Sequence, residues 1–206
     1  MNRVYAVEEL MNMIIKYIFD RIFSLILLVL LLPVILVIFI LHKIKMPKGA
    51  FLYRQVRIGK DGKPFRIFKM RTLVDDSELA GSVTVAGDKR ILPFGKWLRD
   101  SKVDTFLELI NILIGDMSFV GPRPDVPGYA DKLDGDDRVV LKMRPGLTGP
   151  ASIKYRHEDQ ILAQQADPQR YNDEVIWPDK VKINKEYYKN WSVWNDISIL
   201  WQTIFG

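Results

Sequence analysis

The sequence contains no cysteine and two histidines among its 206 residues. The missing cysteine excludes disulfides, thiolate catalysis and zinc–cysteine sites, and the scarcity of histidine disfavours a histidine-based metal site. A cation held by oxygen ligands stays open. The formal net charge of +5 is spread along the chain, and we find no nucleic-acid-binding motif. This charge fits an anionic membrane surface and anionic substrates better than nucleic acid.

The amino-terminal segment is strongly apolar. Residues 22–41 hold no charge, and at about 1.5 Å per residue they span roughly 30 Å, the thickness of a hydrocarbon core. Basic residues flank both ends, and Pro33 removes a helical hydrogen bond near the middle. The segment is therefore either a simple span or a re-entrant helix kinked at Pro33. We expect residues 1–48 to form this membrane segment and residues 49–206 to form a membrane-associated catalytic domain.

Residues 51–71 alternate between apolar and polar side chains around a Lys60-Asp61-Gly62-Lys63 turn. This pattern predicts a β-hairpin. The hairpin is rich in cations, which suit either a solvated edge or bound phosphate. After it, residues 74–90 are polar, contain two glycines and lack a helical period, which predicts a loop that could cover a substrate.

The stretch from residue 95 to residue 125 is where we expect the chemistry. Residues 103–114 predict one buried apolar helix, and the spacing of Asp104, Glu108 and Asn111 would stack their polar atoms on its remaining face. Arg99 and Lys102 precede that face. Asp104 taken alone favours a helix-capping or helix-dipole role, and only the resemblance below shifts this interpretation.

Two glycine-proline turns follow the expected helix. Residues 121–124, Gly-Pro-Arg-Pro, combine exposed backbone with a forked guanidinium donor suited to phosphate, and residues 144–149, RPGLTG, present Arg144 from a stiff frame. An acid, guanidinium groups and exposed amides favour phosphoryl chemistry. Residues 187–206 carry tryptophan and tyrosine at helical spacing, which fits either an amphipathic helix at the membrane interface or a core helix.

Four features together carry a resemblance over most of the chain: Arg99, Asp104, the run GDMSFVGPRP at 115–124 and RPGLTG at 144–149. They resemble the bacterial sugar transferase family, and within it the small monotopic phosphoglycosyl transferases. The resemblance implies a mostly helical α+β fold with a re-entrant membrane helix, one β-hairpin and amphipathic interfacial helices. It also implies transfer of a phosphosugar from a nucleotide diphosphate sugar, expected to be a UDP-sugar, to polyprenyl phosphate. This step would start glycan assembly at the cytoplasmic face of the bacterial inner membrane.

The resemblance also implies residue roles. Asp104 would attack the donor and hold the phosphosugar covalently, with Mg²⁺ as cofactor and Asp104 as its protein ligand. Arg99, Thr105 and Glu108 complete the predicted catalytic set. The predicted substrate-binding residues are Lys69, Arg71, Gly121, Pro122, Arg123, Pro124, Arg144, Lys154 and Arg156. Downstream glycosyltransferases and a second copy of the chain are compatible partners.

The chain departs from the family pattern at three positions. Thr105 stands where the family has the glutamate of an Asp-Glu dyad, Leu32 stands where a serine precedes the proline, and Asn184 stands at a frequent aspartate. Threonine carries no negative charge, so either Glu108, one helical turn from Asp104, supplies the second carboxylate, or the chain is catalytically weak. The alternative function is therefore a membrane scaffold of the same fold that binds lipid or glycan-assembly partners.

Overall fold

The computed structural model describes residues 3–74 and 89–206, with side chains from Met11 onward. The described chain is mostly helical with four short strands. The α-helices are α1 (Arg3–Lys45), α2 (Pro93–Asp100), α3 (Glu108–Ile114), α4 (Pro150–Lys154), α5 (Glu158–Ala163), α6 (Pro168–Tyr171), α7 (Trp177–Lys189) and α8 (Val193–Phe205). The strands are β1 (Leu52–Ile58), β2 (Pro64–Met70), β3 (Ser118–Val120) and β4 (Gly146–Thr148). Short 3₁₀ segments are η1 (Lys60–Gly62), η3 (Val103–Leu107), η4 (Ala130–Lys132) and η5 (Gly135–Lys142), and η6 (Asn172–Ile176) is a π-helix.

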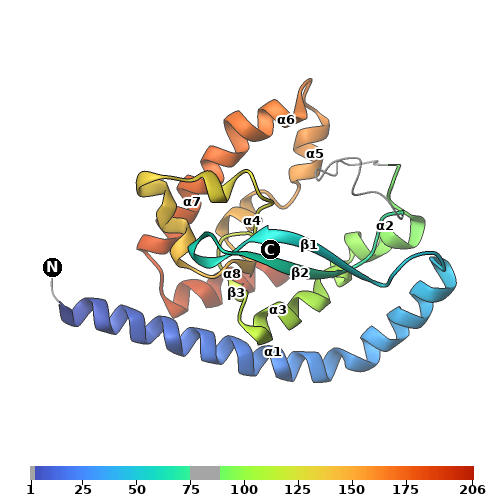
Figure 1. Cartoon of the computed structure of the whole chain (residues 1–206), viewed down its shortest axis with the longest axis horizontal. Helices are drawn as coiled ribbons and strands as arrows, with labels where there is room; N and C mark the ends of the chain where they lie inside the picture. The colour runs from blue at the N-terminus through green and yellow to red at the C-terminus, as the bar shows by residue number, and fades with distance from the viewer. Residues whose placement is uncertain (1–2, 75–88) are drawn as a thin grey trace.

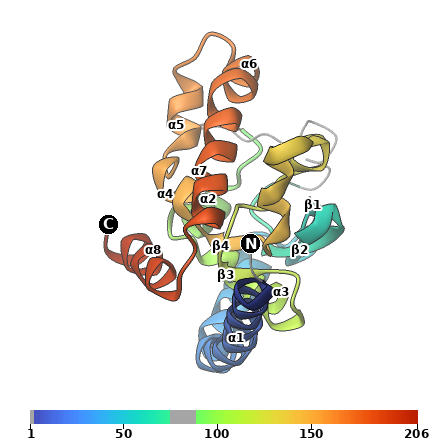
Figure 2. The same ribbon diagram turned by 90° about the vertical axis from the view of Figure 1, so that its left-hand side faces the viewer.

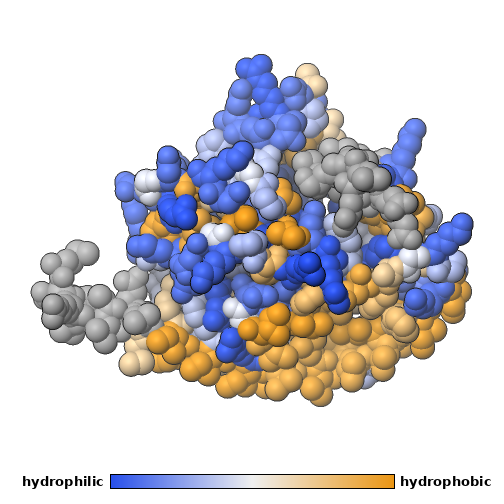
Figure 3. Space-filling view, viewed as in Figure 1, coloured by the Kyte–Doolittle hydropathy of each residue, from blue (hydrophilic) through white to orange (hydrophobic). Residues whose placement is uncertain are grey.

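Helix α1 runs beneath the rest of the chain, and α5 and α6 lie farthest from it (Figures 1 and 2). The helix stays continuous through Pro33 and bows around the domain. Within the described residues, it is the one helix long and apolar enough to cross a membrane. Its outward side chains, such as Leu30 at 66% exposure, form a continuous apolar belt on the lower edge of the molecule (Figure 3).

The predicted hairpin is confirmed. β1 and β2 pair antiparallel from Leu52 opposite Met70 to Ile58 opposite Pro64. The turn between them uses left-handed backbone at Asp61 (φ 59°) and Gly62 (φ 76°), conformations that aspartate and glycine tolerate better than most residues. Of the predicted loop at 74–90, residues 75–88 lie outside the described residues, and its two ends meet in a bridge between Leu73 and Ile91.

The prediction of one helix over residues 103–114 was wrong in its first half. Lys102 adopts left-handed backbone (φ 58°), and the chain continues as the 3₁₀ segment η3 before α3 begins at Glu108. Leu107 at the end of η3 packs with Ile38 of α1 and with Leu98 of α2. Asp104 therefore lies in a 3₁₀ segment that is anchored on α1 through Leu107.

A second sheet, which the sequence analysis did not predict, joins the two glycine-proline turns. β3 and β4 pair in parallel, and the Gly146 amide donates to the Pro122 carbonyl at 2.8 Å. A Cβ atom on Gly121 would lie 2.4 Å from the Arg144 carbonyl oxygen, and one on Gly146 would lie 2.2 Å from the Gly121 nitrogen. The glycines of both motifs are therefore required by close backbone contact between the two turns.

The carboxyl-terminal aromatic stretch is divided between two helices. α7 ends at Lys189, and α8 begins after Ser192, whose hydroxyl accepts the Asn195 amide. Trp194 and Trp201 are 80% and 64% exposed on α8, as expected of an amphipathic interfacial helix. Tyr187 follows the other alternative, because this side chain is buried at 3% exposure in the core.

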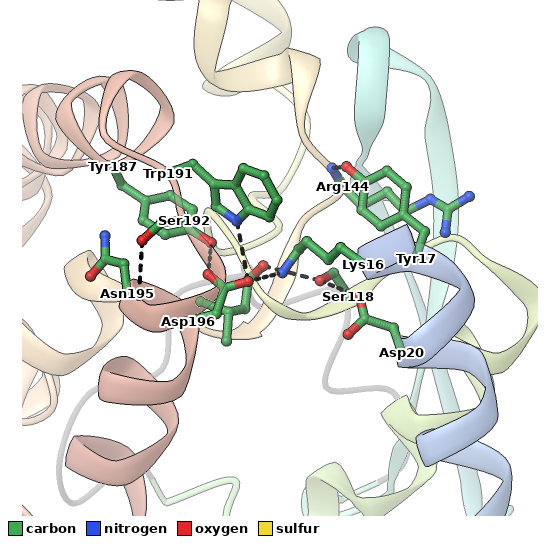
Figure 4. Close-up of polar contacts among 11 residues, drawn as sticks. Lys16, Tyr17, Asp20, Ser118, Arg144, Tyr187, Trp191, Ser192, Asn195 and Asp196 are labelled. Carbon is green, nitrogen blue, oxygen red and sulfur yellow. Dashed lines mark hydrogen bonds and ion pairs between the residues drawn. The ribbon is translucent and has the colours of Figure 1, made fainter. Parts of the chain in front are cut away.

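A buried polar network holds α1 against the carboxyl-terminal helices (Figure 4). Lys16 of α1 forms an ion pair with Asp196 of α8, which also accepts hydrogen bonds from the Tyr187 hydroxyl and, at 3.2 Å, from Trp191 Nε1. A little further along α1, Asp20 accepts the Ser118 hydroxyl at 2.6 Å. Polar groups in an apolar environment need such partners, so the network fixes how α1 and α8 sit relative to each other.

Candidate active site

Asp104 lies in η3 and is partly buried. Burial raises the pKa of its carboxyl group, and the positive charges of Lys69, Arg99 and Lys102 counteract that rise. Left-handed backbone at a residue such as Lys102 costs on the order of 1 kcal/mol or more and is found repeatedly at functional sites. The surroundings of Asp104 are cationic, which suits the binding of an anionic group beside it.

Lys69 of β2 connects Asp104 to Glu108. Its ammonium group lies 3.0 Å from Glu108 Oε1, and the Glu108 side chain is 5% exposed. The same ammonium is the largest charge acting on Asp104. Lys69 therefore acts on both carboxylates, Glu108 by an ion pair and Asp104 through its charge.

Asn111 has a structural role in this arrangement. Its Oδ1 accepts the Phe68 amide at 2.9 Å, and its Nδ2 donates to the Arg66 carbonyl at 2.7 Å. The amide thus ties α3 to the edge of β2 and is fully buried there. Of the three polar side chains predicted to share one face, Asn111 is therefore used to hold α3 against β2, and only the carboxylates of Asp104 and Glu108 remain as candidate site groups.

Thr105 directs its hydroxyl back along the chain. Its Oγ1 donates to the Lys102 carbonyl at 2.7 Å. This bond closes the turn that holds Lys102 in its left-handed conformation. Thr105 therefore supports the backbone on which Asp104 is carried.

The Gly121–Pro124 turn presents Arg123 on the surface, while Gly121, Pro122 and Pro124 are buried. Arg57 of β1 lies beneath it and donates to the Pro124 carbonyl at 3.1 Å. Burial and the charge of Arg123 lower the pKa of Arg57, whereas Asp125 and Glu108 raise it. Arg57 thus faces Glu108 on one side and the Arg123 turn on the other.

Asp125 follows the turn and was missed as a site residue. Burial raises its pKa to about 6, against the opposing charges of Lys180, Arg123 and Arg57. The Ile58 amide donates to the Asp125 backbone carbonyl at 2.9 Å, which joins the turn to the hairpin. A carboxyl group next to the Gly-Pro-Arg-Pro motif was the available sequence signal.

Arg144 lies at the opposite end of α3 from Asp104. Its amide donates to the Tyr17 hydroxyl at 3.1 Å, and its guanidinium carbon is 4.0 Å from the centre of the Tyr17 ring. The nearby charges are Arg21, Asp20 and Asp116, which follow or face the end of α3. The structure thus places Arg144 against α1 and away from the cations around Asp104.

Three further predicted phosphate ligands make contacts within the domain. Arg71 is buried and its guanidinium group donates to the carbonyls of Met46, Lys48, Ala50 and Leu73. Lys154 pairs with Asp179 at 2.6 Å, and Arg156 donates to the Gln202 carbonyl at 2.9 Å near the end of α8. In this arrangement Arg71 secures the chain that leaves α1, and Arg156 caps α8. Phosphate binding by these three side chains stays a prediction.

Magnesium binding was tested against the donor groups present. Within residues 11–74 and 89–206, no group of three or more histidine, aspartate or glutamate side chains is placed to hold a metal ion. Glu108 is already engaged by Lys69. Mg²⁺ is commonly held by one or two carboxylates together with substrate phosphates. A single carboxylate at Asp104 therefore fits an ion that takes its other ligands from a diphosphate.

Residues 11–206 match the profile of the family described as bacterial sugar transferase. The chain is 32% identical over 200 residues to the UDP-glucose:undecaprenyl-phosphate glucose-1-phosphate transferase of Klebsiella pneumoniae, covering 94% of this chain and 40% of that protein. It is 32% identical over 178 residues to the UDP-N-acetylgalactosamine-undecaprenyl-phosphate N-acetylgalactosaminephosphotransferase of Aeromonas hydrophila, covering 84% and 38%.

A shorter relative matches over most of its length. This is the uncharacterized sugar transferase EpsL of Bacillus subtilis, 30% identical over 192 residues, with 93% of this chain and 86% of EpsL covered. By contrast, the chain spans about two fifths of the first two relatives. The match over residues 11–206 includes the hairpin, the Asp104 region and both glycine-proline turns. The chain belongs to the bacterial sugar transferase family.

Proposed function

We propose that the protein transfers a phosphosugar from a UDP-sugar to polyprenyl phosphate through a covalent intermediate on Asp104. The observation that carries the proposal is that the charges of Lys69, Arg99 and Lys102 act on Asp104, which lies in the same segment as Leu107 of the apolar cluster shared with α1. The names of the relatives from Klebsiella and Aeromonas specify UDP-sugars and undecaprenyl phosphate. This chain belongs to the same family as these relatives.

The reaction consists of two displacements at phosphorus. In the first, a carboxylate oxygen of Asp104 bonds to the β-phosphorus of the donor, the bond to the bridging oxygen breaks, and UMP leaves with that oxygen. In the second, a phosphate oxygen of the polyprenyl carrier attacks the same phosphorus, the Asp104 carboxylate is released, and a polyprenyl diphosphate sugar forms. A carboxylate is a competent nucleophile here when cations spread the charge of the transferring group.

The cations of the site have separate tasks in this proposal. Lys69 and Arg99 stabilise the transferring phosphoryl group beside Asp104, and Arg123 holds the donor phosphates from the exposed turn. Arg144 is better placed for an anionic group at the α1 surface. Mg²⁺, when bound with Asp104 and the diphosphate, would neutralise phosphate charge.

The contacts on either side of the apolar run of α1 support the re-entrant arrangement. Lys16 before the run pairs with Asp196, and the Met46 carbonyl after it accepts a hydrogen bond from Arg71. Both flanks of the run therefore contact the same domain, while the lipid-facing side remains apolar. We infer that α1 enters the bilayer and returns to the cytoplasmic face of the inner membrane, where a soluble donor and a lipid acceptor can meet.

The scaffold function is kept as an alternative because of Thr105. Its hydroxyl is engaged with the Lys102 carbonyl and supplies no second carboxylate beside Asp104. Glu108 is the candidate for the second carboxylate, because Lys69 forms an ion pair with Glu108 and its charge also acts on Asp104.

The decisive experiment follows the covalent intermediate. Purified protein in bilayer nanodiscs is incubated with UDP-sugars radiolabelled in the sugar, with Mg²⁺ and without acceptor lipid. We expect UMP release and a labelled protein adduct that disappears in Asp104→Asn and persists in Asp100→Asn, an exposed acid paired with Lys96 on neighbouring α2. Loss of the adduct in both variants, or its survival in Asp104→Asn, contradicts the assigned nucleophile. Absence of UMP release from every donor favours the scaffold.

A second pair of variants tests the missing dyad acid. If Glu108 acts as the second carboxylate, Glu108→Gln should abolish adduct formation while Thr105→Glu gives no increase. If the chain is catalytically weak because the acid is missing, Thr105→Glu should raise the rate strongly. Thermal unfolding of Glu108→Gln controls for loss of the buried Lys69 pair.

A further inference from the structure

A small pocket opens behind the Arg123 turn. Helix α7 forms its floor, α4 and the chain after it form one wall, and the turn forms the other. The side chains that line it include Arg123, Asp125, Tyr155, Trp177, Lys180 and Asn184. The pocket has room for about one water-sized group and is partly open to solvent. A hydroxyl group fits this space, whereas an aromatic or sugar ring does not.

Most charged and polar groups of this pocket already have partners. Lys180 Nζ donates to both carboxylate oxygens of Glu158, at 2.7 and 2.6 Å. The Tyr155 hydroxyl donates to Asp179 Oδ2 at 2.7 Å. These bonds hold Lys180 and Tyr155 in place, and the Glu158 carboxylate balances the positive charge of Lys180.

Asn184 differs from its neighbours. The residue is 7% exposed, and its buried Oδ1 has no hydrogen-bond donor within the described part of the chain. Buried polar atoms are nearly always paired, and leaving an acceptor without a donor costs free energy. Asn184 lies on α7 where the helix faces both the pocket and the Arg123 turn. An unpaired acceptor at the floor of a hydroxyl-sized pocket is the sign of a binding position.

A second acceptor stands beside it. Asp125 lines the same pocket and belongs to the turn that carries Arg123. Two oxygen acceptors next to a guanidinium group suit a molecule that joins phosphate to hydroxyl groups. Trp177, fixed by edge-to-face contact with Tyr129 at 5.3 Å between ring centres, closes the apolar side.

We infer that this pocket binds one hydroxyl group of the nucleotide sugar, with Asn184 Oδ1 and the Asp125 carboxylate as acceptors, while Arg123 holds the adjoining phosphate. The inference rests on the proposed function, because it assigns a subsite for the same donor. The hydroxyl belongs either to the ribose or to the sugar. In both cases Asn184 is a residue that determines which donors are accepted.

The test measures donor binding separately from transfer. In an Asp104→Asn background, which cannot form the adduct, the dissociation constant of the donor is measured by calorimetry with the full chain in nanodiscs. Asn184→Leu keeps the side-chain size and removes the acceptor, and we expect it to weaken binding about 10- to 100-fold. Asn190→Leu, the same change at an exposed position at the end of α7, should leave binding unchanged.

Deoxygenated donors then identify the hydroxyl. A donor that lacks the hydroxyl bound by Asn184 should bind more weakly than the full donor when Asn184 is present. In Asn184→Leu the two donors should bind with equal affinity. Coupling with 2′- or 3′-deoxyuridine donors assigns the ribose, and coupling with a deoxygenated sugar assigns the sugar. Additive losses for every deoxygenated donor, or unchanged binding in Asn184→Leu, overturn the inference.

The two proposals fail in different ways. If donor binding shows the coupling but no UMP is released by the unsubstituted chain, the pocket stands and the transfer proposal falls. If UMP is released and the adduct forms while Asn184→Leu binds donor normally, the transfer proposal stands and the pocket falls. Thermal unfolding of Asn184→Leu shows whether a loss of binding reflects a loss of folded protein.

Discussion

The ion pair between Lys16 and Asp196 should be the strongest single electrostatic contact holding α1 to the domain. The two side chains are 6% and 11% exposed. When one partner of such a pair is removed, the other is left as an uncompensated charge, at a cost of about 3–5 kcal/mol. Lys16→Met should be costly for a further reason, because Asp20 also feels the charge of Lys16.

A double-mutant cycle of Lys16→Met and Asp196→Asn separates the interaction energy of the ion pair from the other effects of each substitution. Tyr187 and Trp191 donate to different carboxylate oxygens of Asp196, and asparagine keeps only one acceptor oxygen, so Asp196→Asn loses one of these hydrogen bonds as well as the charge opposite Lys16. The double variant should be less destabilised than the sum of the single variants, with a coupling energy of about 1–3 kcal/mol. At roughly 2–4 °C per kcal/mol for a chain of this size, Lys16→Met should lower the melting temperature by roughly 10 °C.

The assay is thermal unfolding in detergent micelles followed by circular dichroism. The matched control is Lys96→Met with Asp100→Asn, an ion pair of the same residue types whose side chains are 70% and 64% exposed. Exposed pairs of this kind contribute about 0–1 kcal/mol. If Lys16→Met costs no more than Lys96→Met, or if the buried pair shows no coupling, the reasoning about α1 attachment is wrong.

Three other predictions follow from the structure. Burial raises the pKa of Asp125 from 3.8 to about 6, so the folded state binds more protons than the unfolded state between these values, and the resulting stabilisation is lost as pH rises through about 6. Asp125→Asn should therefore gain roughly 2 kcal/mol relative to the unsubstituted protein between pH 4 and pH 8, and a pH-independent difference in thermal unfolding would contradict this. Thr105→Val should cost about 1 kcal/mol by removing the bond to the Lys102 carbonyl, whereas Thr105→Ser should retain it; equal melting temperatures would argue against that bond. Brominated lipid chains should quench tryptophan fluorescence, and replacing Trp194 and Trp201 by phenylalanine should remove more than half of the quenching, an effect that would be absent if α8 faced away from lipid.

The local elements of this protein could be predicted from the sequence. An uncharged run of twenty residues is long enough for a membrane helix whatever follows it, and alternating side chains around an Asp-Gly turn specify a hairpin. The sequence also placed Asp104 and Glu108 in one short stretch, and Lys69 acts on both carboxylates. The helix, the hairpin and the placement of the two carboxylates each depend on residues that are near one another in the chain.

Only the tertiary structure decided which distant groups meet. Residues 16 and 196 lie 180 positions apart, and no local periodicity relates them. The pairing of β3 with β4 likewise depends on close backbone contact between two glycine turns, and that contact explains both motifs at once. The same holds for Arg71, which the sequence presents as one more cation of the hairpin and which the fold uses to secure the chain leaving α1.

The pocket at Asn184 shows the limit most clearly. In the sequence, Asn184 is one polar residue on a mixed helix, and its burial depends on where α7 packs against the turn after β3. Residue type determined that the side chain can accept a hydrogen bond, and local patterning placed it on a helix. Whether that acceptor finds a partner inside the protein or must take one from a ligand depends on long-range packing, which chain-local patterns do not encode.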